Sequence, residues 1–233
     1  MSNDEQQRKS VLEQAQARLR GADPERVAAL SGAEVDVAHP PRVCPGTHSR
    51  GRLLRQAQDK LCHTGQSVLT LRLLDQTLQL THPRLEVARA DGQPCPQWQA
   101  HLLTYYLSMA DGTNPAGTWV ALRDLPDGMF YQTAYQGYSG GNLVRAFGND
   151  VEAFRAACRA LGGETLNTGD AGYRFLVLPR VWLAAIYWLG EDAIPPSARV
   201  LFDAAIKHYL PTDSCAALGG WLSNRIIEQH RGS

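Results

Sequence analysis

Large aromatic side chains are concentrated in one stretch of the sequence, residues 97–148, and this concentration constrains the fold more than any other feature. The aromatic residues in it include Trp98, Tyr105, Tyr106, Trp119, Phe130, Tyr131 and Phe147. The same stretch carries three turn-forming pairs, Asp111-Gly112, Asp127-Gly128 and Gly140-Gly141. Because large aromatics bury the most apolar area per side chain, we expect this stretch to form the centre of the core.

The composition is that of an ordinary folded protein. Of 233 residues, 44% are hydrophobic and 20% charged, and the formal net charge is zero. A surface without net positive charge argues against non-specific binding to nucleic acid or to an anionic membrane. The longest apolar run, residues 181–189, is far shorter than the roughly 18–20 residues that span a bilayer. Since the polar start MSNDEQQRKS lacks the apolar run of a signal peptide, we expect a soluble cytoplasmic protein with neither nucleic-acid nor membrane partners.

The first half of the chain mixes helical and strand patterns. Residues 11–31 predict two helices, because good helix formers end at Gly21 and Asp23-Pro24 begins a new segment. Alternating apolar and polar residues over 67–91 predict an antiparallel hairpin or meander. Apolar residues recurring every three to four positions predict a helix over 97–109.

The second half continues this mixture. The segments 118–125 and 129–135 predict two short strands, and the glycine-rich segment 137–141 predicts a flexible turn. A helix is expected over 150–163 and another over 213–229. Strands are expected at 173–179, 181–189 and 198–204.

These elements show no regular βαβ alternation, so the sequence predicts the α+β class. We expect a mixed, mainly antiparallel sheet packed against several helices, in a single globular domain with an N-terminal helical extension. The predicted boundaries are a helical segment over residues 1–32, a loop-rich insertion over 33–66 and the α+β core over 67–233.

Several short motifs, in order, resemble a known family. They are ADG (110–112), Gly117, Trp119, RDLPDG (123–128), Phe130-Tyr131, Phe147-Gly148, LGG (161–163), Gly169-Asp170, LPRV (178–181), PPSARVLFD (195–203) and HYLPTD (208–213). Together they resemble a bacterial family of unknown function, number 3786 in its series. The resemblance covers the second half of the chain strongly and the strands over 67–91 weakly.

The resemblance implies a metabolic context for the protein but no activity. Members of the family look like proteins of anaerobes, and some are fused to a small iron-sulfur domain of the kind found in corrinoid proteins of one-carbon metabolism. This chain differs, because it contains no CxxC pair and carries an apparent insertion over residues 40–65. The implied role is an accessory of anaerobic redox or one-carbon metabolism, with a redox or methyl-transfer enzyme as partner.

The insertion holds four candidate metal ligands, spaced C-x3-H-x13-C-H: Cys44, His48, Cys62 and His63. Thiolate and imidazole groups suit zinc and other transition metals, and four of them can complete a tetrahedral site. Adjacent Cys62 and His63 rarely both face one ion, so the alternative is a basic loop with incidental thiols. The five cysteines, an odd number, are otherwise expected to be free thiols.

Two Cys-Pro pairs, Cys44-Pro45 and Cys95-Pro96, are a pattern found where a thiolate ligates haem iron. Candidate second ligands are His48, His82, His101 and His208. Haem, a corrinoid or a transition metal is therefore a candidate cofactor. The simpler alternative is that each proline begins a helix or blocks a sheet edge.

Asp203 is the acidic residue that most needs an explanation, because it ends the apolar strand RVLFD and a buried carboxylate needs a partner. The sequence offers Arg180 or His208 as that partner. We expect a ligand-binding surface formed by Trp119, Tyr131, Asp203, His208 and Tyr209.

No GxSxG, P-loop or HExxH motif is present, so catalytic residues are not assigned and whether the protein is an enzyme stays open. Three functions are carried forward. The first is a non-catalytic accessory that binds a cofactor or a partner, the second is a metal- or tetrapyrrole-binding enzyme, and the third is a structural subunit of a complex.

Overall fold

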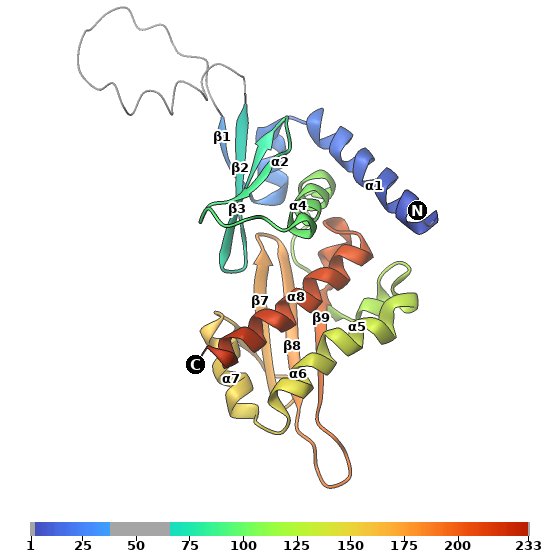
Figure 1. Ribbon diagram of the computed structural model, residues 1–233, viewed down its shortest axis with the longest axis vertical. Coiled ribbons are helices and arrows are strands. Elements are labelled where there is room, and N and C mark those ends of the chain that lie inside the picture. The colour runs from blue at the N-terminus through green and yellow to red at the C-terminus, as the bar shows by residue number, and fades with distance from the viewer. Residues whose placement is uncertain (1–2, 38–65, 233) are drawn as a thin grey trace, which may run out of the picture. The chain divides into compact units, whose positions relative to one another are not determined.

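The computed structural model describes residues 3–37 and 66–232 (Figure 1). The described chain forms two compact units. One contains the described residues up to Arg72 together with Gln76–Gly112, and the other contains Leu73–Asp75 and residues 113–232. Helices and antiparallel strands occur in both, so the α+β class predicted from the sequence is confirmed. The boundaries predicted at residues 32 and 66 stay predictions.

The first unit contains a sheet of order β1–β2–β3–β4 and three helices among its described residues. Its elements are α1 (Asn3–Arg20), α2 (Pro24–Ser31), β1 (Glu34–Val37), β2 (Ser67–Leu73), β3 (Gln76–His82), β4 (Val87–Arg89) and α4 (Gln97–Met109). Asp23 caps α2 by accepting the Glu25 N–H, and Gly32 ends the helix in the left-handed conformation. This start and stop match the two-helix pattern of the sequence.

The second unit contains a sheet of order β5–β9–β8–β7–β6. Its strands are β5 (Trp119–Val120), β6 (Glu164–Leu166), β7 (Ala171–Leu178), β8 (Val181–Trp188) and β9 (Ser197–Asp203). Its α-helices are α5 (Gln132–Tyr138), α6 (Gly140–Phe147), α7 (Val151–Ala160) and α8 (Thr212–Arg231), and its 3-10 helices are η1 (Leu122–Asp124), η2 (Gly128–Tyr131) and η3 (Ala204–His208).

One face of this second sheet forms the core of the unit. Phe175, Leu183 and Phe202 are paired across β7, β8 and β9, and all three are at most 1% exposed. The helices α6, α7 and α8 pack on the sheet (Figure 1). The opposite face carries two arginine and tryptophan contacts, Arg174 over Trp182 and Arg199 over Trp188.

The expectation that residues 97–148 form the centre of one core is wrong. Tyr106 is buried in the first unit and Phe147 in the second, because the chain passes from one unit to the other at residue 113. Phe130, in the same stretch, is 87% exposed. The aromatic residues of this stretch therefore belong to the cores of two different units, and one of them, Phe130, lies on the surface.

The strand predicted over 129–135 is also wrong, because these residues form η2 and the start of α5. Aromatic composition favoured a strand, but Tyr135 packs on Phe202 with ring centroids 5.7 Å apart and donates its hydroxyl to the Val200 carbonyl. Tertiary packing has overridden local propensity here. The flexible turn predicted over 137–141 is likewise wrong, since α6 begins at Gly140 and packs on β9.

Candidate functional site

Asp203 is buried, with 2% of its surface exposed, and its carboxylate binds backbone amides. One oxygen accepts the Ala116 N–H at 2.8 Å and the other accepts the Gly117 N–H at 2.7 Å. The first oxygen also accepts the Ala205 N–H at 2.9 Å, which caps η3. The sequence indicated correctly that this carboxylate needs a partner, but the partners are these amides rather than Arg180 or His208.

The other residues of the predicted ligand surface lie at different places in the second unit. Trp119 is half-buried and pairs with Asp203 across β5 and β9. Tyr209 is fully buried and donates its hydroxyl to the Thr113 carbonyl. His208 ends η3, and Tyr131 ends η2 with 40% of its surface exposed. Asp203 and Tyr209 thus both hold the segment around residues 113–117, and their participation in ligand binding stays a prediction.

The four candidate metal ligands Cys44, His48, Cys62 and His63 lie outside the described residues, so this prediction is untested. Over residues 3–37 and 66–232, no group of three or more histidine, cysteine or acidic side chains is arranged to hold a metal ion. Cys95 is half-buried, and its thiol approaches the Gln99 side-chain oxygen at 3.8 Å. Burial raises the pKa of the Cys95 thiol, which disfavours the thiolate that a metal or haem iron requires.

Cys158 on α7 and Cys215 on α8 are fully buried in the second unit. Burial raises the pKa of both thiols far above the ordinary value. These two cysteines therefore behave as small apolar core residues.

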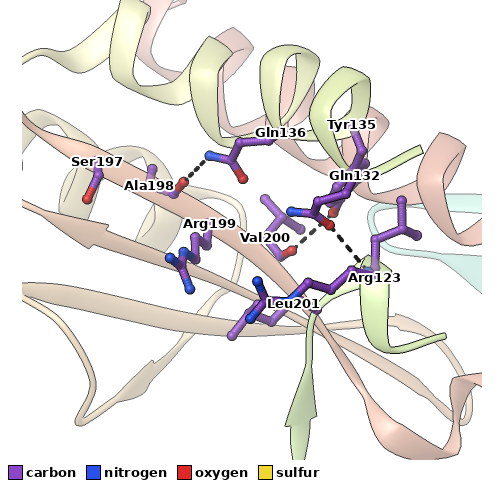
Figure 2. A pocket seen from close by; sticks show the side chains of 11 residues that line it. Arg123, Gln132, Tyr135, Gln136, Ser197, Ala198, Arg199, Val200 and Leu201 are labelled. Carbon is purple, nitrogen blue, oxygen red and sulfur yellow. Dashed lines mark hydrogen bonds between the residues drawn. The ribbon is translucent and has the colours of Figure 1, made fainter. Parts of the chain in front are cut away.

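A groove of about 240 Å³ lies between α5 and the edge of β9 (Figure 2). It is lined by Ala121, Leu122, Arg123, Gln132, Tyr135, Gln136 and the β9 residues Ser197, Ala198, Arg199, Val200 and Leu201. Two arginines and no carboxylate are among these residues. The groove is thus a positively charged site within the second unit.

The groove exists because β5 is only two residues long. It pairs Trp119 with Asp203 and Val120 with Phe202, and the chain then turns away into η1. Along the remaining edge of β9, from Ser197 to Leu201, no other described strand pairs on this side. Two side chains of α5 cover part of this edge: Gln136 donates to the Ala198 carbonyl at 2.8 Å, and Tyr135 donates to the Val200 carbonyl at 3.1 Å.

The direction of these carbonyls also fixes the direction of the adjacent amides. In an antiparallel strand, the N–H and C=O groups of one residue point to the same side, and alternate residues share that side. The Ala204 N–H bonds to the Thr118 carbonyl on the β5 side, so the N–H groups of Ala198 and Val200 also point there. Figure 2 shows both carbonyls directed towards α5. Ala198 and Val200 are at most 2% exposed, so α5 and the start of α6 cover this part of the edge.

Exposed apolar side chains occur in the sequence just before the two elements that form the groove. Phe130 is 87% exposed and Met129 is 75% exposed, and both belong to η2, which leads directly into α5. Ile194, which lies three residues before β9, is 71% exposed. Large apolar residues therefore occur just before each of the two elements that form the groove.

Sequence reasoning missed the groove, although a signal was present. Gln132 and Gln136 are four residues apart, so they share one face if residues 132–138 form a helix. A strand over these residues does not bring the two side chains together in this way. Arg123 and Arg199 lie within the motifs RDLPDG and PPSARVLFD, which by themselves indicate only the family resemblance.

Comparison with known proteins gives one family. A family model described as "Domain of unknown function (DUF3786)" matches residues 55–225. No curated protein and no solved structure matches the chain. Among the described residues, every helix is too short or too polar to cross a membrane.

Proposed function

Because this chain belongs to the DUF3786 family, a domain of unknown function, we propose its function from its own surface. We propose that the protein is a binding accessory. In this role it holds a partner protein against the groove between α5 and β9 and against the exposed side chains of η2.

The observation that carries this proposal is the exposure of Phe130 and Met129, side by side in one short helix. Burying a side chain of this size is favourable by about 1.5–3 kcal/mol, so two such residues in water forgo several kcal/mol of stability. Exposed apolar residues grouped together are typical of protein interaction sites. Aromatic residues and methionine are also enriched in the centre of interfaces.

The roles of the buried polar residues support binding rather than catalysis. The Asp203 carboxylate is committed to three backbone amides, and the Tyr209 hydroxyl to a backbone carbonyl. These side chains fix the loop that leads into β5. Their hydrogen bonds account for their burial without any reacting group.

The proposed setting follows from the family resemblance. We propose that the partner is a redox or methyl-transfer enzyme in the cytoplasm of an anaerobe. The alternative of a metal- or tetrapyrrole-binding enzyme would draw its ligands from Cys44, His48, Cys95 and His208. The alternative of a structural subunit depends on apolar surface that only contacts a partner. Both alternatives stay predictions.

Site-specific cross-linking tests the proposal. A photo-cross-linking amino acid replaces Phe130 in one variant and Val11 in a matched control. Val11 is another exposed apolar residue, 44% exposed on α1. After irradiation in an extract of the source cells, we expect a discrete cross-linked product from position 130 that is missing from position 11, with the partner identified by mass spectrometry.

The cross-linked product should also be reduced at least five-fold when Met129 is replaced by Ser in the same variant, since a real interface loses a contact. Identical products from positions 130 and 11, or no discrete product from position 130, would contradict the proposal.

A further inference from the structure

We propose that the groove between α5 and β9 binds a small molecule that carries a carboxylate or a phosphate group. Arg123, Arg199 and the side-chain amide of Gln132 would hold this oxyanion. The inference goes beyond the proposed function, because the ligand is a small molecule and not the partner protein. A ligand in the groove leaves the exposed side chains of η2 available to that partner, since none of the described lining residues belongs to η2.

The side chain of Gln132 offers N–H donors to the groove. Its oxygen accepts the backbone N–H of Arg123 at 3.2 Å, which fixes the orientation of the amide because only the oxygen can accept. The amide nitrogen is therefore directed away from this bond and into the groove (Figure 2). Within the described part of the chain, no acceptor binds this nitrogen, so its N–H groups are available to a ligand.

The backbone carbonyls that would repel an anion are already bonded. The Gln136 amide nitrogen donates to the Ala198 carbonyl at 2.8 Å, and the Tyr135 hydroxyl donates to the Val200 carbonyl at 3.1 Å. Burial raises the pKa of Tyr135 well above its ordinary value, so this hydroxyl stays protonated and remains a donor. The side-chain oxygen of Gln136 is left as an acceptor, which suits a hydroxyl group on the ligand.

Arg199 differs from the other arginine that lies over a tryptophan on the same face of the sheet. Arg174 lies over Trp182 and donates to one Glu164 oxygen at 2.9 and 2.7 Å. Arg199 lies over Trp188, with 5.9 Å between the guanidinium carbon and the ring centroid. Over residues 3–37 and 66–232, no carboxylate forms an ion pair with Arg199. The ring limits the freedom of this guanidinium, and its N–H groups remain available to an anion.

Arg123 adds a second positive charge. Its guanidinium approaches the Asp124 carboxylate at 3.7 Å, but the two side chains are 59% and 49% exposed, so this ion pair is weak. The same carboxylate accepts the Ala121 N–H at 2.9 Å, which holds it at the start of η1. Figure 2 shows the Arg123 and Arg199 side chains on the same side of β9. The paired N–H groups of arginine match the oxygens of a carboxylate or phosphate.

The volume of the groove, about 240 Å³, limits the ligand to a small molecule. Liquid water occupies about 30 Å³ per molecule, so this space corresponds to roughly eight water molecules. Pockets for drug-sized ligands are larger, at about 300–1,000 Å³. A short carboxylic acid or phosphorylated compound of about ten non-hydrogen atoms or fewer therefore matches the groove, whereas a tetrapyrrole is too large for it.

A titration followed by nuclear magnetic resonance tests the inference with the isotope-labelled, full-length protein. The probes are inorganic phosphate and succinate, each compared with sodium chloride at the same ionic strength. We expect at least one probe to shift the side-chain amide signals of Gln132 and to saturate with a Kd of about 1 mM or lower, as two or three hydrogen bonds to a charged group provide. Saturation by phosphate alone supports a phosphorylated ligand, saturation by succinate alone a carboxylic acid, and saturation by both a site for either oxyanion.

Three variants separate the groove from general surface charge. Arg199→Gln removes a guanidinium that lies over a tryptophan, and Arg174→Gln removes the same kind of contact outside the groove, as the matched control. Gln132→Glu keeps an oxygen that accepts from Arg123 but replaces the N–H donors with negative charge. We expect Arg199→Gln and Gln132→Glu each to weaken binding at least about ten-fold, because each loses a hydrogen bond to a charged group. Arg174→Gln should leave binding within about two-fold. Circular dichroism checks the fold of each variant.

The inference is overturned if neither probe saturates the Gln132 signals below about 10 mM, or if Arg174→Gln weakens binding as much as Arg199→Gln. It is also overturned if only the partner cross-linked at position 130 shifts these signals, since an acidic side chain of the partner would then occupy the groove. A cross-linked product at position 130 together with a failed titration would leave the proposed function intact and remove only the anion site. Anion binding without that product would do the reverse.

Discussion

The carboxylate of Asp203 joins three segments of the second unit. It accepts hydrogen bonds from the loop at Ala116 and Gly117 and from the first turn of η3, while its own residue pairs β9 with β5. Hydrogen bonds to a charged group are each worth about 1.5–3 kcal/mol. A single buried side chain therefore determines where β5 begins.

Replacing Asp203 by Asn should destabilise the second unit by about 2–4 kcal/mol. The amide keeps one acceptor but turns an N–H donor towards a backbone N–H group, which leaves buried donors unpaired. Thermal unfolding followed by circular dichroism measures the loss. The exposed carboxylate of Glu152, changed to Gln, is the matched control and should alter stability by less than about 0.5 kcal/mol. A similar small change at Asp203 would show that the three amides find other partners.

Burial at Asp203 could be predicted from the sequence, and its partners could not. The apolar run before it places the carboxylate at the end of a core strand. A buried carboxylate is unfavourable unless it has a hydrogen-bond or ion-pair partner. A sequence shows charged candidates such as Arg180, but it does not show which backbone amides a loop will turn inward. Gly117 is a local sign of an unusual loop, because its φ of +70° suits a residue without a side chain.

At the scale of elements, the backbones of α6 and β9 are in direct contact at Gly140 and Ala198. A Cβ atom on Gly140 would lie 2.1 Å from the Ala198 carbonyl oxygen and 2.6 Å from the Gln136 side-chain nitrogen. Only glycine fits there, because the first neighbour is rigid backbone. This packing holds Gln136 against the edge of β9.

Changing Gly140 to Ala should therefore destabilise the second unit by about 3 kcal/mol, since either α6 or β9 must move. Gly137, three residues earlier in α5, provides the control because a Cβ atom there meets nothing within 4 Å. Gly137→Ala should be neutral or stabilising by up to about 1 kcal/mol. Urea unfolding of both variants measures the difference, and equal effects would refute the packing argument.

Elements with one clear periodicity could be predicted from the sequence. The strands β7 and β8 were expected because apolar β-branched and aromatic residues surround the break at Pro179. The helical residues 129–141 could not be predicted, because their aromatic and glycine content is typical of strands and turns. Their helicity depends on the contact of Tyr135 with Phe202 and on the hydrogen bond of Gln136 to the Ala198 carbonyl, both to partners more than 60 residues away.

At the scale of the molecule, every strand and α-helix of the second unit comes from residues 119–231, and Leu73–Asp75 is its sole earlier part among the described residues. This short segment has few polar contacts, but its Leu73 and Leu74 side chains are buried. The Leu74 N–H donates to the Val177 carbonyl at 2.8 Å, and Asp75 forms a partly exposed ion pair with Arg225. The division into two units could not be predicted, because periodicity identifies elements but not which of them share a core.

A fragment of residues 113–233 should fold by itself, with a free energy of unfolding lower by about 3–6 kcal/mol than that of the same unit in the full chain, chiefly because Leu73 and Leu74 are lost. Circular dichroism should show a single cooperative thermal transition. The full-length variant Asp75→Ala, which loses the ion pair with Arg225 but keeps that of Arg225 with Glu228, should fall between the two. A fragment without cooperative unfolding would show that the second unit depends on the rest of the chain.

The buried cysteines have a practical consequence. The thiolate is the form that reacts with alkylating agents, and burial keeps Cys158 and Cys215 both covered and protonated. Each can react only when its helix leaves the sheet. The rate at which iodoacetamide modifies each residue is read from its own tryptic peptide. These two rates report local opening of the protein at two separate positions. The rate at Cys158 measures the opening of α7 and the rate at Cys215 measures the opening of α8. Neither measurement requires an introduced label.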